Sequence, residues 1–291
     1  MVQVTDAVKE KETGPWKEAW RSYKKSKVAI IGAAIVLFVV FLALFGPLLA
    51  PQGMNEQDLS QRLLPPSAEH WFGTDDFGRD IFSRIILGAR ISIAVGFFSV
   101  MLSIIVGTFL GIIAGYYGGW LDTIISRIFD ILLAFPSILL AIAIVSILGP
   151  SLQNALIAIA IINIPNFGRL VRSKVLSVKQ EEYIMAARAI GMKNKRILWK
   201  HILPNSMTPV IVQGTLAIAT AIIEAAALGF LGLGAQAPTP EWGKMLADAR
   251  IYLLNAPWTI VFPGVAIMIT VLGFNLMGDG LRDALDPKMK N

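Results

Sequence analysis

The sequence predicts an all-α polytopic membrane protein with six transmembrane helices. Three observations predict this fold class: 55% of the 291 residues are hydrophobic, only 16% are charged, and long charge-free stretches recur along the chain. A soluble domain has roughly 25% charged residues and about 45–50% apolar ones. A spanning helix needs about 20 mostly apolar residues, because an unpaired charge in hydrocarbon is costly.

The charge-free stretches delimit the expected helices. The first predicted span covers residues 28–50, and an extracytoplasmic loop of residues 51–88 follows it. A cleaved signal peptide is the rival interpretation of this span, but its apolar region would cover only about 7–15 residues. The other five spans lie within a core of residues 89–278, at about 91–117, 123–148, 153–170, 204–230 and 256–277. The turn signal at residues 149–154 divides the third span from the fourth.

The basic residues indicate the orientation. Twenty of the 26 Lys and Arg lie in or beside four segments that this topology puts on one side, and six lie in the other loops. The four segments are the tail of residues 1–27, the turn after the second span, the loop of residues 171–203 and the tail of residues 279–291. Because loops rich in Lys and Arg stay in the cytoplasm, we expect both termini and the loop of residues 171–203 to be cytoplasmic.

The N-terminal tail contains an amphipathic pattern. Trp16, Ala19, Trp20 and Tyr23 recur at helical spacing, and basic residues fill the other face after Pro15. This pattern predicts a short helix lying in the headgroup region of the membrane. A disordered basic tail is the alternative.

Glycine and proline mark packing features of the spans. Gly107, Gly111, Gly115 and Gly119 follow one another at four-residue spacing. Such a stripe of small residues lets two helix backbones approach closely, either inside a bundle or between subunits. Pro136 and Pro165 remove backbone donors, so each is expected to kink its helix.

Few ionisable residues fall inside the spans. Glu224 lies in the middle of the fifth span, and we consider a buried interhelical hydrogen bond or a role in a gate or substrate path. Arg127 and Asp130 lie three residues apart near the cytoplasmic end of the third span. Their spacing predicts an ion pair within one helix.

Motifs for enzymatic chemistry are not evident. The string of residues 232–237 matches a dinucleotide-binding pattern, but it follows a membrane span instead of a strand, so we reject it. Asp75, Asp76 and Asp80 with His70 could suggest a metal cluster, but the glycines among them favour a turn with helix-start aspartates. The chain has no cysteine and no recognisable nucleophile with a base. We therefore expect no enzyme, no catalytic residue, no cofactor and no bound metal.

The loop of residues 171–203 has an ordered pattern. Tyr183, Ile184, Ala187 and Ile190 form a helical apolar edge, and Gly191 can take the left-handed conformation that ends a helix. A basic helix is expected to resume over residues 193–202, before Pro204. This helix–glycine–helix elbow has the form of a docking element, and a helix pair anchored on lipid phosphates is the alternative.

This elbow resembles the EAA loop of permease subunits of ABC importers. The pattern of that loop is Glu-Ala-Ala, three residues, Gly, nine residues, Ile, one residue and Leu-Pro. The chain keeps this spacing throughout and departs at two positions, where Met185 replaces Glu and His201 replaces Ile. The resemblance implies that six residues couple the chain to an ATPase: Met185, Ala186, Ala187, Gly191, Leu203 and Pro204.

Longer matches resemble one branch of this family, the C-type permeases of dipeptide and oligopeptide importers. They cover the segment before the second span and much of the C-terminal half, at residues 72–84, 88–92, 229–234, 238–243, 256–258 and 274–287. Importers of nickel, metallophores and glutathione share this architecture. The resemblance therefore implies the branch and leaves these cargoes open.

The resemblance implies a type I ABC importer permease fold in the cell membrane of a bacterium. The chain is then expected to form half of the translocation pathway for di- or oligopeptides. The implied partners are a second permease subunit in a heterodimer, two cytoplasmic ATP-binding subunits and an extracytoplasmic solute-binding protein. Membrane lipid is also expected to contact the chain, whereas nucleic acid is not.

An outer helix is expected within residues 241–254. Trp242, Met245 and Leu246 would lie on one edge, which we interpret as a surface for the binding protein. A self-sufficient channel or secondary carrier is the rival class of function. It would transport when alone in a membrane and without ATP.

Overall fold

The computed structural model describes residues 15–285, and their side chains from residue 19 onward. Every regular element in this part of the chain is helical, which confirms the predicted fold class. Five helical segments are long and apolar enough to cross a membrane: α2 (Lys27–Leu49), α3 (Ile81–Tyr117), α6 (Leu152–Val178), the rod Asn194–Phe230 and α11 (Trp258–Leu285). A sixth crossing is formed if the pair α4 (Gly119–Leu133) and α5 (Ser137–Leu148) counts as one span.

The pair α4–α5 replaces the single helix expected at residues 123–148. The two helices meet at an angle of 95°. Pro136 lies at the break and is the N-cap residue of α5. Proline has no N–H for the helix and disfavours helical backbone at the residue before it, so the helix is interrupted here. The kink expected at Pro136 is therefore confirmed. Pro165 is different, since α6 continues through it as one helix.

Several helices continue beyond the charge-free stretches. α3 begins at Ile81 because the Asp80 carboxylate accepts a hydrogen bond from the backbone N–H of Ser83 at 2.8 Å. α6 and α11 likewise run past Lys174 and Arg282. The absence of charge marks the apolar part of a helix, whereas capping residues mark where the helix begins or ends.

The glycine stripe brings α3 against α6, so it serves a contact within the chain. A Cβ atom built on Gly107 would lie 2.8 Å from the Ile164 carbonyl oxygen, and one on Gly111 would lie 2.5 Å from the Gly168 carbonyl oxygen. Gly115 abuts the backbone of α6 in the same way. Gly119 does not join this contact: it begins α4 with φ +60° and has nothing within 4 Å. Glycine at this position allows the positive φ of the turn after α3.

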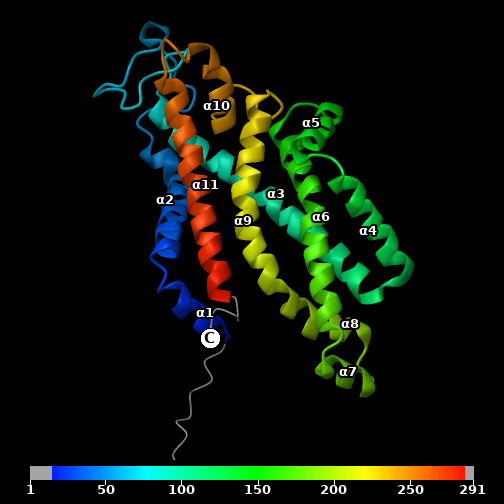
Figure 1. Ribbon diagram of the computed structural model, residues 1–291. Coiled ribbons are helices and arrows are strands. Elements are labelled where there is room, and N and C mark those ends of the chain that lie inside the picture. Colours follow the sequence, from blue (N-terminus) through cyan, green and yellow to red (C-terminus); the bar gives the residue numbers. More distant parts are fainter. Residues whose placement is uncertain (1–14, 286–291) are drawn as a thin grey trace, which may run out of the picture.

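α2 packs along α11, and the two helices run side by side in Figure 1. Gly32 lies against the backbone of Met277, and Gly280 lies against Ala29. α1 (Pro15–Tyr23) lies where the sequence predicts a helix in the N-terminal tail. Its Ala19 is buried, and its Trp20 is 58% exposed. The Trp16 side chain, residues 1–14 and residues 286–291 of the predicted tails lie outside the described residues.

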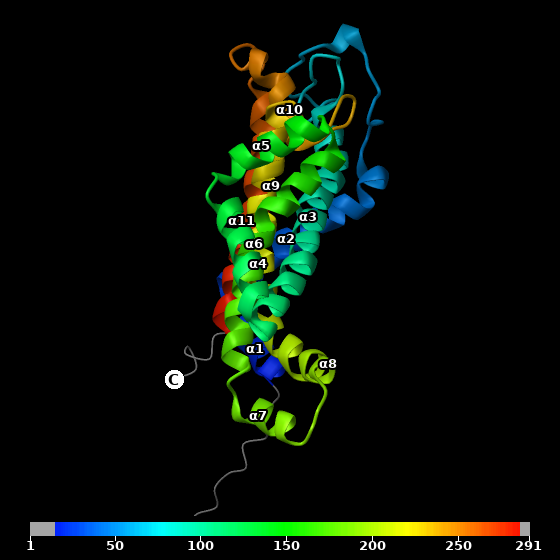
Figure 2. The ribbon, with the colours of Figure 1, turned by 90° about the vertical axis from the view of Figure 1, so that its right-hand side faces the viewer.

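The bundle has two distinct ends. α10 (Trp242–Ala249) and the long loop after α2 lie at one end, and α7 (Glu182–Ala189) with α8 (Asn194–Ile197) lies at the other (Figure 1). The perpendicular view in Figure 2 shows the same separation. Three short elements complete the described chain: two 3-10 turns, η1 (Leu59–Gln61) and η3 (Arg250–Tyr252), and the π-helical turn η2 (Leu198–Ile202).

Candidate functional site

The predicted elbow lies between α7 and α8. Gly191 joins them with φ +79°, the left-handed backbone conformation that glycine adopts without steric cost. α8 then continues through η2 into α9 (Leu203–Phe230), so that one helical rod of 37 residues runs from Asn194 to Phe230. The second arm of the elbow is therefore the beginning of a spanning helix.

The candidate coupling residues divide between two faces of the elbow. Ala187 is buried, as are Ile184 of α7 and Ile197 of the rod, which belong to the same hydrophobic cluster. Met185 and Ala186 are exposed on the other face. Met185 and Ala186 are therefore accessible from outside the chain, whereas Ala187 is not.

Leu203 and Pro204 do not end the basic helix as expected; they lie inside the rod, in the first turn of α9. Pro204 cannot donate a backbone hydrogen bond, and the π-helical turn η2 occurs directly before it. The Asn205 side chain donates to the His201 carbonyl oxygen at 2.6 Å. These local bonds keep the helix continuous past the proline.

Tyr116, at the end of α3, fastens the elbow to the bundle. Its hydroxyl donates to Asn194 Oδ1 at 2.7 Å, and its backbone carbonyl accepts from Lys179 Nζ at 2.6 Å. The Arg188 guanidinium lies 5.4 Å from the centre of its ring. The sequence alone does not indicate a role for Tyr116, because it lies 78 residues from Asn194 and belongs to no local pattern.

Tyr116→Phe is expected to loosen the elbow without unfolding the bundle. The change removes one hydrogen bond to a neutral partner, which contributes about 0.5–1.5 kcal/mol. We expect faster hydrogen exchange in residues 182–197 of the purified protein, with unchanged exchange in α11. Tyr117→Phe is the matched control because Tyr117 is exposed. Equal exchange in both variants would contradict the role of Tyr116.

Glu224 lies inside the bundle, 8% exposed, where α9 passes α6. The Asn163 side chain donates to Glu224 Oε2 at 3.2 Å and to the Ile159 carbonyl oxygen at 3.0 Å. The interhelical hydrogen bond considered for Glu224 is thus present. A buried polar pair of this kind fixes the register of two helices.

A groove lies between the Glu224–Asn163 pair and the end of the bundle that carries the elbow. We call it the polar groove; it has a volume of about 700 Å³ and lies between α6, α9 and α11. Its lining includes hydroxyl, amide and cationic side chains: Ser173, Lys174, Ser177, Asn205, Thr208, Gln213 and Arg282. Asn166 of α6 and Thr220 of α9 are also exposed polar residues of these helices.

The groove faces away from α3. No residue of α3 lines it, and α3 packs on the other side of α6, against Gly168, and of α9, against Ile222. Apart from Arg90 near its beginning, the exposed side chains of α3 are large and apolar or aromatic, among them Phe98 and Phe109. Hydrocarbon tolerates such apolar residues, whereas lipid-exposed polar groups are costly. The α3 face therefore suits lipid, and the face with the groove suits water or protein.

Ion pairs hold α4 against α6 beside the groove. Arg172 of α6 donates to Asp122 Oδ2 of α4 at 2.7 Å, and Arg169 of α6 pairs with Asp130. The predicted Arg127–Asp130 pair is present only as a long contact of 3.9 Å between exposed groups. The closer partner of Asp130 comes from another helix, which spacing along α4 could not indicate.

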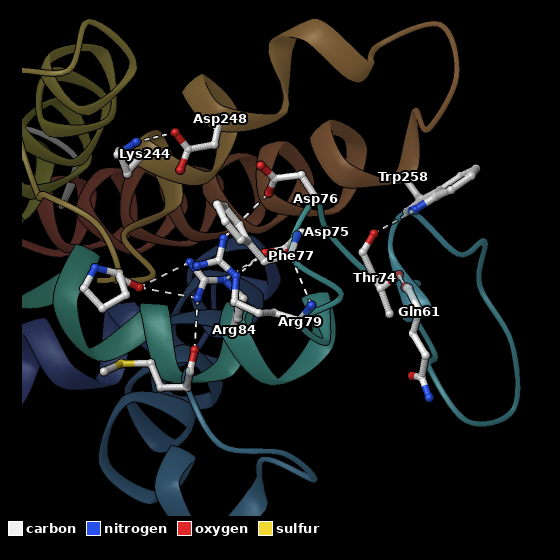
Figure 3. Close-up of polar contacts among 12 residues, drawn as sticks. Gln61, Thr74, Asp75, Asp76, Phe77, Arg79, Arg84, Lys244, Asp248 and Trp258 are labelled. Carbon is white, nitrogen blue, oxygen red and sulfur yellow. Dashed lines mark hydrogen bonds and ion pairs between the residues drawn. The ribbon is translucent and has the colours of Figure 1, made fainter. Parts of the chain in front are cut away.

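The opposite end of the bundle is closed by a network of charged side chains (Figure 3). Arg84 is buried and donates to the carbonyl oxygens of Met54 at 3.0 Å and Pro238 at 3.4 Å. Arg79 Nε donates to Asp75 Oδ2 at 2.6 Å. Burial and the neighbouring Asp75 raise the pKa of the Asp76 carboxyl. The network joins the loop after α2 to the loop after α9, and it encloses a cavity of only about 20 Å³, room for about one water molecule.

The aspartates of this region act as predicted, in a turn and at a helix start. Asp75 Oδ1 accepts from the backbone N–H groups of Phe77 and Arg79, and Asp80 caps α3. His70 Nδ1 lies 3.1 Å from Asp80 Oδ1. Within residues 15–285, no group of three or more His, Cys, Asp or Glu side chains is arranged to hold a metal ion.

α10 lies where an outer helix is expected, but its apolar edge points inward. Trp242 is buried and donates from Nε1 to the Ile85 carbonyl oxygen at 3.0 Å, and Met245 is buried beside it. The edge that we expected to meet a binding protein therefore packs on α3. Glu241 caps α10, and burial raises the pKa of its carboxyl, while hydrogen bonds from two backbone N–H groups oppose that effect.

The comparisons with known proteins agree on one family. The family model described as binding-protein-dependent transport system inner membrane component matches residues 107–291. The model of the N-terminal TM domain of oligopeptide transport permease C matches residues 14–66.

Curated relatives are similar over nearly the whole chain. The dipeptide transport system permease protein DppC of Alkalihalophilus pseudofirmus is 68% identical over 277 residues, which cover 95% of this chain and 91% of the relative. The glutathione transport system permease protein GsiD of Salmonella paratyphi A is 53% identical with the same coverage. A solved chain of the inward-facing MetNI methionine ABC transporter aligns with a TM-score of 0.58 at 21% identity, over 71% of this chain and 98% of that one. This structural likeness supports the fold.

Proposed function

Because this chain belongs to the inner membrane components of binding-protein-dependent transport systems, we propose that it forms half of a dipeptide translocation pathway and transmits motion to it from cytoplasmic ATPases. The chain is a permease subunit of an ATP-driven importer, not an enzyme. One observation carries the proposal for the mechanism: the helical rod from Asn194 to Phe230 joins the elbow directly to the spanning helix that borders the polar groove.

The proposed pathway runs along the face of α6 and α9 that turns away from α3. The polar groove occupies this face toward the elbow, and the Glu224–Asn163 pair lies farther from the elbow between the same helices. A second permease of like fold would supply the other half of the wall. Peptides remain solvated along a polar wall, whereas an apolar face would exclude their charged ends.

The elbow is the proposed site of coupling. Docking of an ATP-binding subunit on Met185 and Ala186 would move α7, and Ala187, Gly191, Leu203 and Pro204 would pass that motion into α9. A packed helix pair transmits such motion as a rigid body. The expected assembly contains this chain, a second permease, two ATP-binding subunits and a solute-binding protein, with both termini and the elbow in the cytoplasm.

Glu224→Gln is expected to change transport more than assembly. The glutamine keeps an oxygen that accepts from Asn163, so the helices stay in register, but it removes the ionisable carboxyl group beside the proposed pathway. We expect the rate of ATP-dependent dipeptide uptake to change severalfold, while the yield of complex in size-exclusion chromatography stays constant. Asn163→Asp, at the other end of the same hydrogen bond, is the comparison variant. Unchanged uptake kinetics in Glu224→Gln would assign Glu224 to helix packing alone.

The cargo is tested by ATP hydrolysis in the purified complex with its binding protein. We expect dipeptides to stimulate hydrolysis more strongly than glutathione, nickel or a nickel–metallophore complex, because the dipeptide permease is the relative at 68% identity and the glutathione permease is at 53%. Stimulation by glutathione alone would overturn the dipeptide assignment and leave the importer mechanism in place.

A further inference from the structure

We propose that the polar groove binds the terminal carboxylate of a peptide in transit, through Lys174 of α6 and Arg282 of α11. This inference rests on the proposed function, since it assigns a ligand chemistry to the wall of the proposed pathway. Both cations line the same groove and both are exposed to it. They come from helices that are far apart in the sequence, so the fold and not a local motif brings them together.

Within the part of the chain that the structure describes, the two cations differ from their basic neighbours in having no acidic partner. Arg169 and Arg172 of α6 pair with Asp130 and Asp122 of α4. Within residues 15–285, neither Lys174 nor Arg282 lies within 4.0 Å of a carboxylate. No Asp or Glu lines the groove. The groove therefore has a net positive lining that an anionic ligand would neutralise.

The other side chains of the groove complete a site for a small polar ligand. Ser173, Thr208 and Gln213 offer hydroxyl and amide groups beside the cations. A volume of about 700 Å³ lies within the range of small-molecule sites, roughly 300–1,000 Å³. Lys174 and Arg282 are exposed, so a single ion pair here would be weak. Weak binding suits a pathway, because a tightly held peptide would not leave.

A carboxylate is the group that such a site can recognise in varied peptides. Peptide side chains differ in size and charge, but every unmodified peptide ends in a carboxylate. Arg can hold a carboxylate through two parallel hydrogen bonds, and Lys adds a point charge. The groove can therefore attract peptides without selecting among their side chains.

The test uses the assembled complex in lipid vesicles. The probe is the dipeptide alanyl-benzoylphenylalanine, whose benzophenone forms a covalent link to nearby protein under light, and its C-terminal amide is the comparison ligand. The double variant K174Q/R282Q is expected to raise the half-saturating dipeptide concentration for cross-linking roughly tenfold, which corresponds to about 1.4 kcal/mol, because it removes two weak ion pairs to the carboxylate together. Cross-linking of the amide should not change, and K174R should behave as the native protein.

The control variant K25Q/R127Q removes one Lys and one Arg that lie outside the groove. It should leave the half-saturating concentration unchanged. Equal half-saturation in K174Q/R282Q and the native complex would overturn the carboxylate site.

A lipid phosphate is the other anion that could occupy the groove. The measurement is therefore repeated in vesicles with and without phosphatidylglycerol. An effect of K174Q/R282Q that occurs only with phosphatidylglycerol would assign the groove to lipid and overturn the proposal. ATP-dependent dipeptide uptake by the native complex is measured alongside: absent uptake would reject the proposed function, whereas normal uptake with unaltered cross-linking would reject only the carboxylate site.

Discussion

Gly191→Val is expected to uncouple ATP hydrolysis from peptide uptake. Gly191 has φ +79°, and a residue with a Cβ atom pays about 1–2 kcal/mol in left-handed backbone, with a further cost for β-branching. Beyond its two chain neighbours, no atom of the described residues lies within 4 Å of the Cβ that valine would add, so the change alters the backbone and leaves the packing intact. The elbow would have to reorient α7. We expect uptake to fall roughly tenfold or more while hydrolysis by the complex continues.

The measurement compares ATP hydrolysis and dipeptide uptake in the same proteoliposomes. Gly232→Val is the matched control. Gly232 has φ +77°, is equally free of neighbours and lies in a turn with the same backbone hydrogen-bond pattern as that of Gly191, but it follows α9, at the end of the bundle away from the elbow. In both variants, valine at a positive φ is expected to cost a similar free energy. If Gly191→Val keeps the native ratio of uptake to hydrolysis, the elbow does not transmit motion.

Gly111→Ala is expected to cause a large loss of stability. The added Cβ would lie 2.5 Å from the Gly168 carbonyl oxygen and 2.9 Å from Val171 Cβ. Because the nearest atom belongs to the backbone, α3 and α6 must separate to admit the methyl group. Overpacking of this kind costs typically about 1–3 kcal/mol. We expect a lower Tm of the purified complex, and a lower yield of assembled complex from membranes.

Gly264→Ala tests the same change where there is room for it. Gly264 lies in α11, and the nearest atom to an added Cβ is 4.0 Å away. This variant should keep the native Tm or raise it slightly, since alanine favours helix. Equal Tm values for Gly111→Ala and Gly264→Ala would show that the close approach of α3 and α6 is not needed.

The sequence predicts the helical membrane fold well because the bilayer imposes it. Long charge-free stretches indicate the crossings, and the turn at Gly149 and the break at Pro136 are found where the sequence indicates them. The ends of the helices are less predictable. α3 starts before Arg84, whose buried guanidinium donates to two carbonyl oxygens and lies 3.5 Å from the Asp75 carboxylate, whereas hydropathy alone treats any arginine as the end of a span.

The elbow is also predictable, because it is built from consecutive residues and from a glycine with a special conformation. The residues that distant helices bring to the elbow and to the polar groove are not predictable in this way. Tyr116, Lys174 and Arg282 reach their places through contacts between distant helices. The inward edge of α10 shows the same limit: a periodic apolar pattern predicts a buried face, but it does not say whether the same chain or a partner covers it.

ATP-dependent dipeptide uptake in proteoliposomes tests the central claim most directly. We expect uptake only when this chain is reconstituted with its second permease, the ATP-binding subunits, the binding protein and ATP. This chain alone should pass no dipeptide, with or without an ion gradient. Uptake by this chain alone, driven by a concentration or ion gradient without ATP, would contradict the account and support a self-sufficient channel or secondary carrier.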